Sequence, residues 1–130
     1  MRPNRLQLAS VITFFLLMAA CSPRLSGTWT VQRFETSQPG QPGVTLTNIG
    51  TLTFKGQGQG EKNIRYSVLG VTRDDQSIFS WEWHDGVYVT IEGSESEFAK
   101  TWIVMVNKKK YQKWKSTDGG DKVQVLELSK

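Results

Sequence analysis

The chain has 130 residues, which is enough for one domain of ordinary size. With 38% hydrophobic and 22% charged residues, its composition is that of a folded globular protein and excludes an intrinsically disordered chain. Cys21 is the only cysteine, so no disulfide within the chain can form. The formal net charge is +4.

The first predicted element is a signal peptide over residues 1–20. Arg2 and Arg5 precede an apolar stretch that ends in small residues at Ala19 and Ala20. This stretch is too short and too interrupted by polar residues for a membrane-spanning helix, which needs about 20 apolar residues. Once the two arginines are removed, the 16 basic side chains become 14 against 12 acidic ones, a net charge of +2. This small excess does not predict nucleic-acid binding.

Residues 18–21, Met-Ala-Ala-Cys, resemble the lipobox of bacterial lipoproteins, with Met18 where leucine is preferred. The resemblance implies that the Cys21 sulfur receives a diacylglyceryl group, that the chain is cut before Cys21, and that the new amine is acylated. Acyl chains such as palmitate would then anchor the chain stably to a membrane. The alternative is an ordinary secretory signal that is cut after Ala20. By the same resemblance, Ser22 favours the outer membrane, and the lack of an acidic cluster after Cys21 favours its periplasmic face.

After a lipidated tether at residues 21–26, residues 27–130 predict β-strands and no helix. Short runs rich in β-branched and aromatic residues are each closed by Gly, Asn, Asp or Ser. The predicted strands cover residues 27–35, 49–55, 62–71, 77–83, 87–92, 99–106, 110–116 and 122–128. Short links force neighbouring strands to pair antiparallel, and eight strands with one apolar face close naturally into a barrel. The sequence therefore predicts a single all-β domain, an eight-stranded antiparallel up-and-down barrel.

Two local expectations follow from the same patterns. Strict alternation places Trp29, Val31 and Arg33 on one face of the first strand. Asp74-Asp75 is expected to lie in a turn between the third and fourth strands, because Asp is enriched in turns.

Residues 25–29, Leu-Ser-Gly-Thr-Trp, resemble the Gly-x-Trp signature of lipocalins. Together with the lipobox, the short tether and the later segment GTLTFKGQGQG, they make the mature chain similar to the small lipocalin-like lipoproteins of Bacteroidetes-type bacteria. In lipocalins the tryptophan packs at the barrel floor against an arginine from near the last strand. No arginine follows Arg73 here, so the resemblance implies a replacement, for which Lys115 and Lys122 are the candidates. The Thr-Asp-Tyr motif of that family is absent, since Gly119 follows Thr117-Asp118.

Seven aromatic residues are the candidate lining of the barrel interior: Trp29, Phe54, Tyr66, Trp81, Trp83, Trp102 and Trp114. They predict either a cavity for a small hydrophobic ligand, as in lipocalins, or a solid core in a small barrel. The first alternative implies a lipid-anchored binding protein of the cell envelope. The second implies a structural or interaction protein of the envelope with no small-molecule ligand.

The sequence predicts no catalytic residues, no metal site and no cofactor. His84 is the only histidine, and it lies beside an Asp85-Gly86 hairpin turn without convergent ligands or a nucleophile. The Gly-x-Gly-x-Gly segment at residues 56–60 is a hairpin turn, because a phosphate loop would be followed by a helix. The lysine-rich stretch at residues 108–115 is interpreted as a solvated strand face that guards against edge pairing. Its alternative role is contact with anionic lipid headgroups.

Overall fold

The computed structural model describes residues 25–93, 96–117 and 120–130. Cys21 and the predicted signal peptide lie outside this range. The strands are β1 (Gly27–Ser37), β2 (Val44–Thr47), β3 (Gly50–Lys55), β4 (Gln59–Val68), β5 (Val71–His84), β6 (Tyr88–Gly93), β7 (Thr101–Lys108), β8 (Tyr111–Ser116) and β9 (Val123–Ser129). One 3-10 turn, η1 (Gly56–Gly58), joins β3 to β4 and is the only helical element among the described residues.

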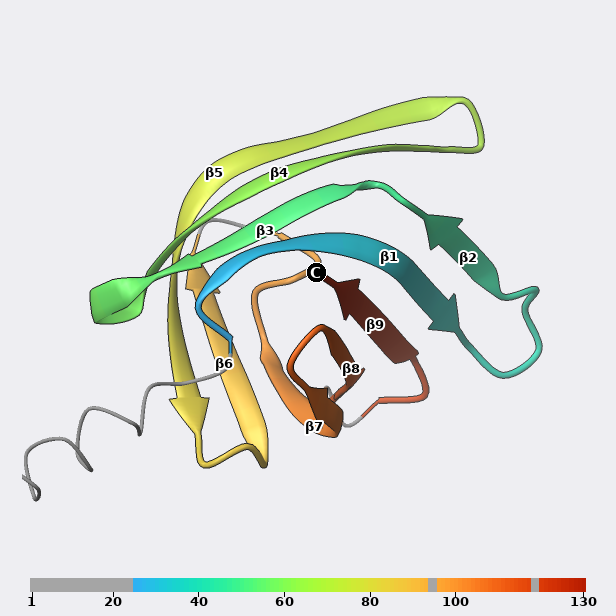
Figure 1. Ribbon diagram of the computed structural model, residues 1–130. Coiled ribbons are helices and arrows are strands. Elements are labelled where there is room, and N and C mark those ends of the chain that lie inside the picture. Colours follow the sequence, from blue (N-terminus) through green and yellow to red (C-terminus); the bar gives the residue numbers. More distant parts are fainter. Residues whose placement is uncertain (1–24, 94–95, 118–119) are drawn as a thin grey trace, which may run out of the picture.

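The strands form one closed antiparallel sheet (Figure 1). β3 to β9 pair in chain order, and β1 pairs with both β3 and β9, which closes the ring. Along one edge of β1, residues 27–30 pair with β3 and residues 33–36 pair with β2. β2 and β3 therefore share one place in the ring. The predicted eight-stranded up-and-down barrel is confirmed.

The register gives the barrel two distinct ends. Gly27 pairs with Phe54, and Ser37, at the other end of β1, pairs with Val123. The end where the chain enters β1, called the tether end below, holds η1 and the turns after β5 and β7. The opposite end, called the distal end, holds the Leu69-Gly70 turn and the connections 37–44, 93–101 and 116–123.

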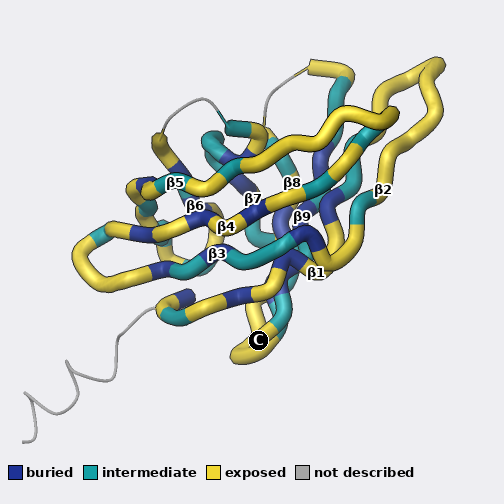
Figure 2. The backbone as a smooth tube through the Cα atoms, turned by 90° about the horizontal axis from the view of Figure 1, so that it is seen from above, coloured by how far each residue is buried: buried dark blue, intermediate teal, exposed yellow. Residues whose placement is uncertain are grey.

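The core is a layer of inward-facing apolar side chains, which the alternation of buried and exposed residues along the strands makes visible (Figure 2). Trp29, Trp102 and Trp114 are fully buried within it. A buried indole N–H needs an acceptor. Each of the three has one: the carbonyl of Leu25 at 2.8 Å, the carbonyl of Phe98 at 3.0 Å, and the Gln112 side-chain oxygen at 3.1 Å, respectively.

The expectation for the face of Arg33 was wrong. The register of β1 against β9 shifts between Val31 and Arg33, which marks a β-bulge. The extra residue reverses the alternation, so Phe34 is buried while Arg33 faces solvent and forms an ion pair with Glu35 at 2.7 Å. The spacing of the buried residues Trp29, Val31 and Phe34, two positions and then three, fits this bulge.

The expected turn at Asp74-Asp75 was also wrong. β4 and β5 stay paired as far as Val68 and Val71, so both aspartates lie within β5. The turn is Leu69-Gly70, and both residues have positive φ, 52° and 79°, as a two-residue hairpin requires. This outer part of the hairpin is largely exposed, so its alternation carries little apolar signal.

Candidate functional site

A pocket of about 680 Å³ opens at the distal end of the barrel. Its walls come from β4, β5, the connection between β6 and β7, and the residue before β9. The polar residues of the lining are Tyr66, Arg73, Asp74, Asp75, Ser96, Glu97, Lys100 and Lys122. Most of the exposed lining is polar, in contrast to the apolar core nearer the tether end.

The alternation of β4 and β5 brings polar side chains into the distal half of the interior. Phe79 is buried on β5, and the next inward positions toward the distal end are Ser77 and Asp75. On β4 the inward face carries Lys62, whose side chain is fully buried. The interior thus changes from aromatic to charged toward the pocket.

Asp75 is the acceptor at the centre of one polar cluster. Ser96 donates to Oδ2 at 2.6 Å, and Ser77 donates to Oδ1 at 3.3 Å. Lys62 Nζ lies 3.2 Å from Oδ1, within ion-pair distance, but its alignment does not meet hydrogen-bond geometry. A buried ammonium without a counter-charge is costly. Asp75 therefore compensates the positive charge of Lys62 inside the barrel. Sequence reasoning missed Lys62, although its place between Gly60 and Ile64 on an inward-facing alternation indicates it.

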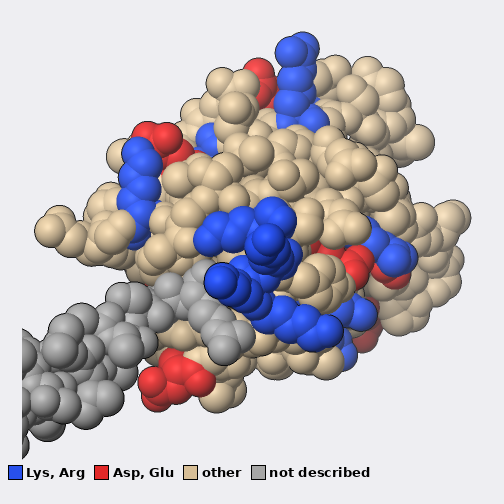
Figure 3. Space-filling model, viewed as in Figure 1, with Lys and Arg blue, Asp and Glu red and all other residues tan. Residues whose placement is uncertain are grey.

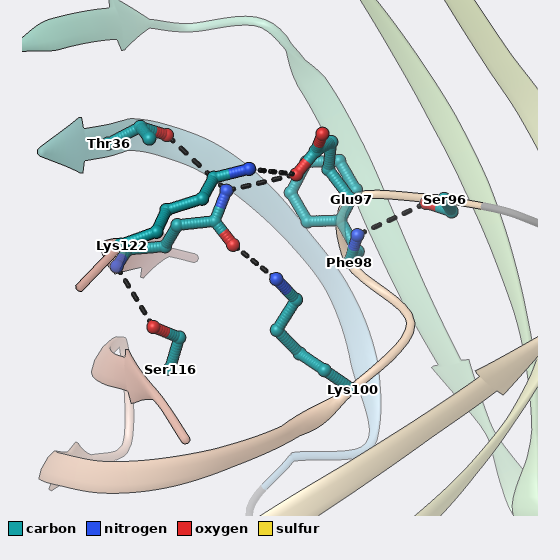
Figure 4. A network of polar contacts seen from close by, with 8 residues as sticks. Thr36, Ser96, Glu97, Phe98, Lys100, Ser116 and Lys122 are labelled. Carbon is teal, nitrogen blue, oxygen red and sulfur yellow. Dashed lines mark hydrogen bonds and ion pairs between the residues drawn. The ribbon is translucent and has the colours of Figure 1, made fainter. Parts of the chain in front are cut away.

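A second cluster surrounds Glu97 (Figure 4). The Gln124 side chain, 1% exposed, donates through Nε2 to Glu97 Oε2 at 3.0 Å and to Thr36 Oγ1 at 3.3 Å. The Gln124 side-chain oxygen accepts a hydrogen bond from Lys100 Nζ, and Lys122 Nζ lies 3.5 Å from Glu97 Oε2. The hydrogen bond from Gln124 lowers the pKa of Glu97, helped by the charges of both lysines and opposed by burial. Glu97 is therefore held as a carboxylate.

These contacts fasten the connection between β6 and β7 across the distal end. Phe98 is buried and packs against Phe34 with ring centroids 5.0 Å apart. Ser96 and Glu97, just before Phe98, are bonded to β5 and β9, respectively. The connection thus covers the apolar core with Phe98 and presents its polar residues to the pocket.

The pocket keeps unused acceptors as well as unused donors, and the exposed Asp74 carboxylate on its wall is one of the acceptors. Asp75 and Glu97 already accept from side chains of the barrel. The Arg73 guanidinium makes no ion pair or side-chain hydrogen bond within the described residues, and neither does the Tyr66 hydroxyl. Burial raises the pKa of Tyr66, as do the charges of Glu97 and Asp75, against the opposing charge of Arg73. The hydroxyl therefore keeps its proton and remains a donor.

The structure separates the seven aromatic residues that the sequence singled out. Trp29, Phe54, Trp102 and Trp114 are packed in the core, each 0–1% exposed. Trp81 and Trp83 are partly buried and pack against that core, and the Trp81 indole donates to the Gln59 carbonyl at 2.6 Å near the tether end. Of the seven, Tyr66 lines the distal pocket. The prediction that these residues bind a ligand stays a prediction.

His84 lies at the tether end, away from the pocket. Its ring stacks on Tyr88 with centroids 4.3 Å apart, and Nε2 is 3.8 Å from the Glu82 carboxylate. Within the described ranges, no group of three or more His, Cys, Asp or Glu is placed to hold a metal ion. In the same ranges, no helix has the length and apolar character needed to cross a membrane.

Comparison with known proteins finds no match among family models, curated proteins or solved structures. Function must therefore be argued from the sequence motifs and from the pocket itself.

Proposed function

We propose that this chain is a lipid-anchored protein of the bacterial cell envelope, and that its barrel binds a small anionic ligand at the distal end without catalysing a reaction. The anchor, acyl chains on Cys21 in the outer membrane, is supported by the lipobox-like residues 18–21. Ligand binding is supported by one observation: a pocket in which the Arg73 guanidinium and the Tyr66 hydroxyl have no side-chain partner among the described residues.

The size of the pocket suits a small molecule. Ligand sites in proteins generally occupy about 300–1,000 Å³. About 680 Å³ lies within that range. Lys62 and Lys122 are neutralised by Asp75 and Glu97, which leaves the Arg73 guanidinium as the natural partner for a carboxylate or phosphate.

The resemblance to lipocalins implies a hydrophobic ligand, and the pocket modifies that expectation. The apolar interior is filled by aromatic side chains, so an entirely apolar ligand would have to displace packed rings. An acid with an apolar part, such as a fatty acid, needs only its charged group at Arg73 and can lay the rest against Tyr66 and Ala99. Such a ligand reconciles the resemblance with the polar lining.

The second candidate is a structural or interaction protein of the envelope with no small ligand. The observation that favours it is the solid aromatic core, together with the internal partners of Asp75 and Glu97. On this hypothesis the distal clusters only hold the connection between β6 and β7 in place.

One experiment separates the two. The purified protein is extracted with organic solvent for mass spectrometry and is titrated calorimetrically with oleate and with methyl oleate. We expect the acid to bind and the ester, which lacks the charge, to bind about tenfold more weakly or worse, because a hydrogen bond to a charged group contributes about 1.5–3 kcal/mol. Arg73→Gln should weaken oleate binding by a similar factor, whereas Arg65→Gln, an exposed change on β4, should leave it unaltered. Equal binding of acid and ester would overturn the preference for an anion and the role of Arg73, whereas no binding by either would support the structural alternative.

The anchor is tested separately in cells. Cys21→Ser should abolish labelling with radioactive palmitate and leave the precursor uncut, because the cysteine sulfur is the atom that receives the diacylglyceryl group. Labelling that persists in the variant would overturn the lipoprotein assignment. It would leave the proposal of ligand binding in the distal pocket unaffected.

A further inference from the structure

Three consecutive lysines lie at the tether end, where Lys108 ends β7 and Lys109 and Lys110 form the turn to β8. Lys108, Lys109 and Lys110 are all exposed. The Lys110 carbonyl accepts a hydrogen bond of 3.0 Å from the backbone N–H of Lys130, and Lys130 Nζ donates to the Ser26 carbonyl at 2.7 Å. The lysine turn, the end of the last strand and the start of the first strand are thus joined. Figure 3 shows lysines gathered over this part of the surface, where β7, β8 and β9 lie.

We call Lys108, Lys109, Lys110 and Lys130 the basic rim. None of these four forms an ion pair with an acidic side chain in the part of the chain that the structure describes. Among the acidic groups at the tether end, Glu61 is paired with Lys55 at 2.7 Å, and Asp85 and Glu82 belong to the neighbouring β5–β6 hairpin. The rim is therefore an uncompensated patch of positive charge.

Protection of a free sheet edge does not explain these lysines. β8 is hydrogen-bonded to β7 on one side and to β9 on the other, so the closed barrel has no exposed edge there. The turn itself could carry any polar residues. A different role for the repeated positive charge is needed.

The short distance from the lysines to the proposed anchor at Cys21 indicates a role at the membrane surface. Cys21 precedes Leu25 by four residues, and an extended chain spans at most about 3.6 Å per residue, so the Cα atoms of Cys21 and Leu25 can be no more than about 15 Å apart. Leu25 is fully buried at the tether end, where its carbonyl accepts the Trp29 indole N–H. Attraction between charges extends over a screening length of about 8 Å at physiological ionic strength. An anchor at Cys21 therefore allows the basic rim to approach a bilayer surface within the screening length.

We propose that the basic rim binds the headgroups of anionic phospholipids and holds the barrel with its tether end on the membrane. This inference rests on the lipid anchor of the proposed function. Each lysine near such a surface contributes about a fivefold gain in affinity. Because the distal end is opposite, the pocket then faces away from the bilayer and takes its ligand from the aqueous side.

The test uses the mature protein added to vesicles of phosphatidylcholine, with or without phosphatidylglycerol. A membrane-impermeant amine reagent labels the lysines, and mass spectrometry gives the rate for each peptide. On the anionic vesicles we expect labelling of residues 108–110 to slow by about fivefold or more relative to neutral vesicles. High salt should reverse the protection. Lys115, an exposed residue on the barrel wall, should be labelled at the same rate on both.

A matched pair of variants sharpens the result. Lys109→Gln/Lys110→Gln removes two charges from the rim and should reduce the protection of Lys108, whereas Arg65→Gln/Lys115→Gln removes two charges from the wall and should not. Equal labelling of the rim on both kinds of vesicle would overturn the proposal.

Failure of the anchor has a different signature. Without acyl chains, the protein would not be retained on neutral vesicles, whatever the rim does. Retention on neutral vesicles therefore reports on Cys21, and the difference in labelling between the two kinds of vesicle reports on the rim.

Discussion

The ammonium of Lys130 lies over the indole ring of Trp29, with Nζ 5.1 Å from the ring centroid. The same Nζ donates to the Ser26 carbonyl at 2.7 Å, so Lys130 connects the end of the last strand to the start of the first. Gly27 makes room for it: a Cβ there would lie 2.7 Å from Nζ, and its φ of 120° suits glycine. Lys130, and neither Lys115 nor Lys122, is the cation beside the tryptophan of the Gly-x-Trp segment.

Lys130→Gln should lower the free energy of unfolding by about 1 kcal/mol, because a cation–π contact and a charge-assisted hydrogen bond are lost. Lys130→Arg keeps both interactions and should retain most of the stability. Urea denaturation followed by tryptophan fluorescence measures both changes, with Lys115→Gln as the exposed control. If Lys130→Gln matches that control, the contact contributes nothing to closing the barrel.

Asp75 should be far more important for stability than its neighbour Asp74. Asp75→Asn leaves the fully buried Lys62 ammonium without a counter-charge and should cost about 3–5 kcal/mol. Asp74→Asn, at an exposed position of the same strand, should stay within about 0.5 kcal/mol of the wild type.

The coupling between Asp75 and Lys62 can be measured directly. Lys62→Met removes the charge that needs compensation, so the double variant Lys62→Met/Asp75→Asn should be more stable than Asp75→Asn alone. Denaturant titrations of all four proteins complete the cycle. Additive changes in the free energy of unfolding would show that the ammonium does not depend on Asp75.

The barrel could be predicted because the sequence patterns that specify it involve residues close together in the chain. Alternation at Ile64, Tyr66 and Val68, the Asp85-Gly86 turn and the short links all point to antiparallel neighbours, and closure follows from the number of strands. Inward positions were predictable by the same rule, as with Gln112 and Trp114 on β8, both fully buried.

The pocket could not be predicted because it depends on pairs far apart in the chain. Glu97 meets Gln124 and Ser96 meets Asp75 only once the ring has closed. Asp75 looked like a turn residue, since Leu69 at positive φ is an unusual hairpin residue and concealed the true turn. The aromatic residues predicted the apolar interior of the barrel, but they gave no sign that the pocket at its distal end is lined by polar residues.

The contact between Glu97 and Gln124 should make the distal end sensitive to acid. The folded protein holds the pKa of Glu97 below its ordinary value of 4.5. Its contribution is therefore fully present above about pH 4.5 and is lost as the pH falls through the lowered folded-state value. Glu97→Gln should destabilise the protein at neutral pH by about 1 kcal/mol, and its difference from the wild type should shrink in acid.

Urea midpoints across this pH range provide the measurement. Glu92→Gln, an exposed change on β6, is the control and should parallel the wild type throughout. A difference between Glu97→Gln and the wild type that is constant with pH would mean that the carboxylate form of Glu97 has no special role in holding the connection.

The glycines of the Gly-x-Gly-x-Gly segment should differ sharply in their tolerance of a methyl group. A Cβ at Gly60 would lie 2.4 Å from the Phe79 ring and 2.8 Å from the Thr53 carbonyl oxygen, whereas nothing lies within 4 Å of one at Gly56. Gly60→Ala should therefore cost about 1–3 kcal/mol through overpacking, and Gly56→Ala should be neutral or slightly stabilising. Equal effects in denaturant titrations would contradict the close approach at Gly60. Adding Phe79→Leu should lower the cost of Gly60→Ala only in part, because shortening the ring relieves the first clash and leaves the second, with the backbone of β3, in place.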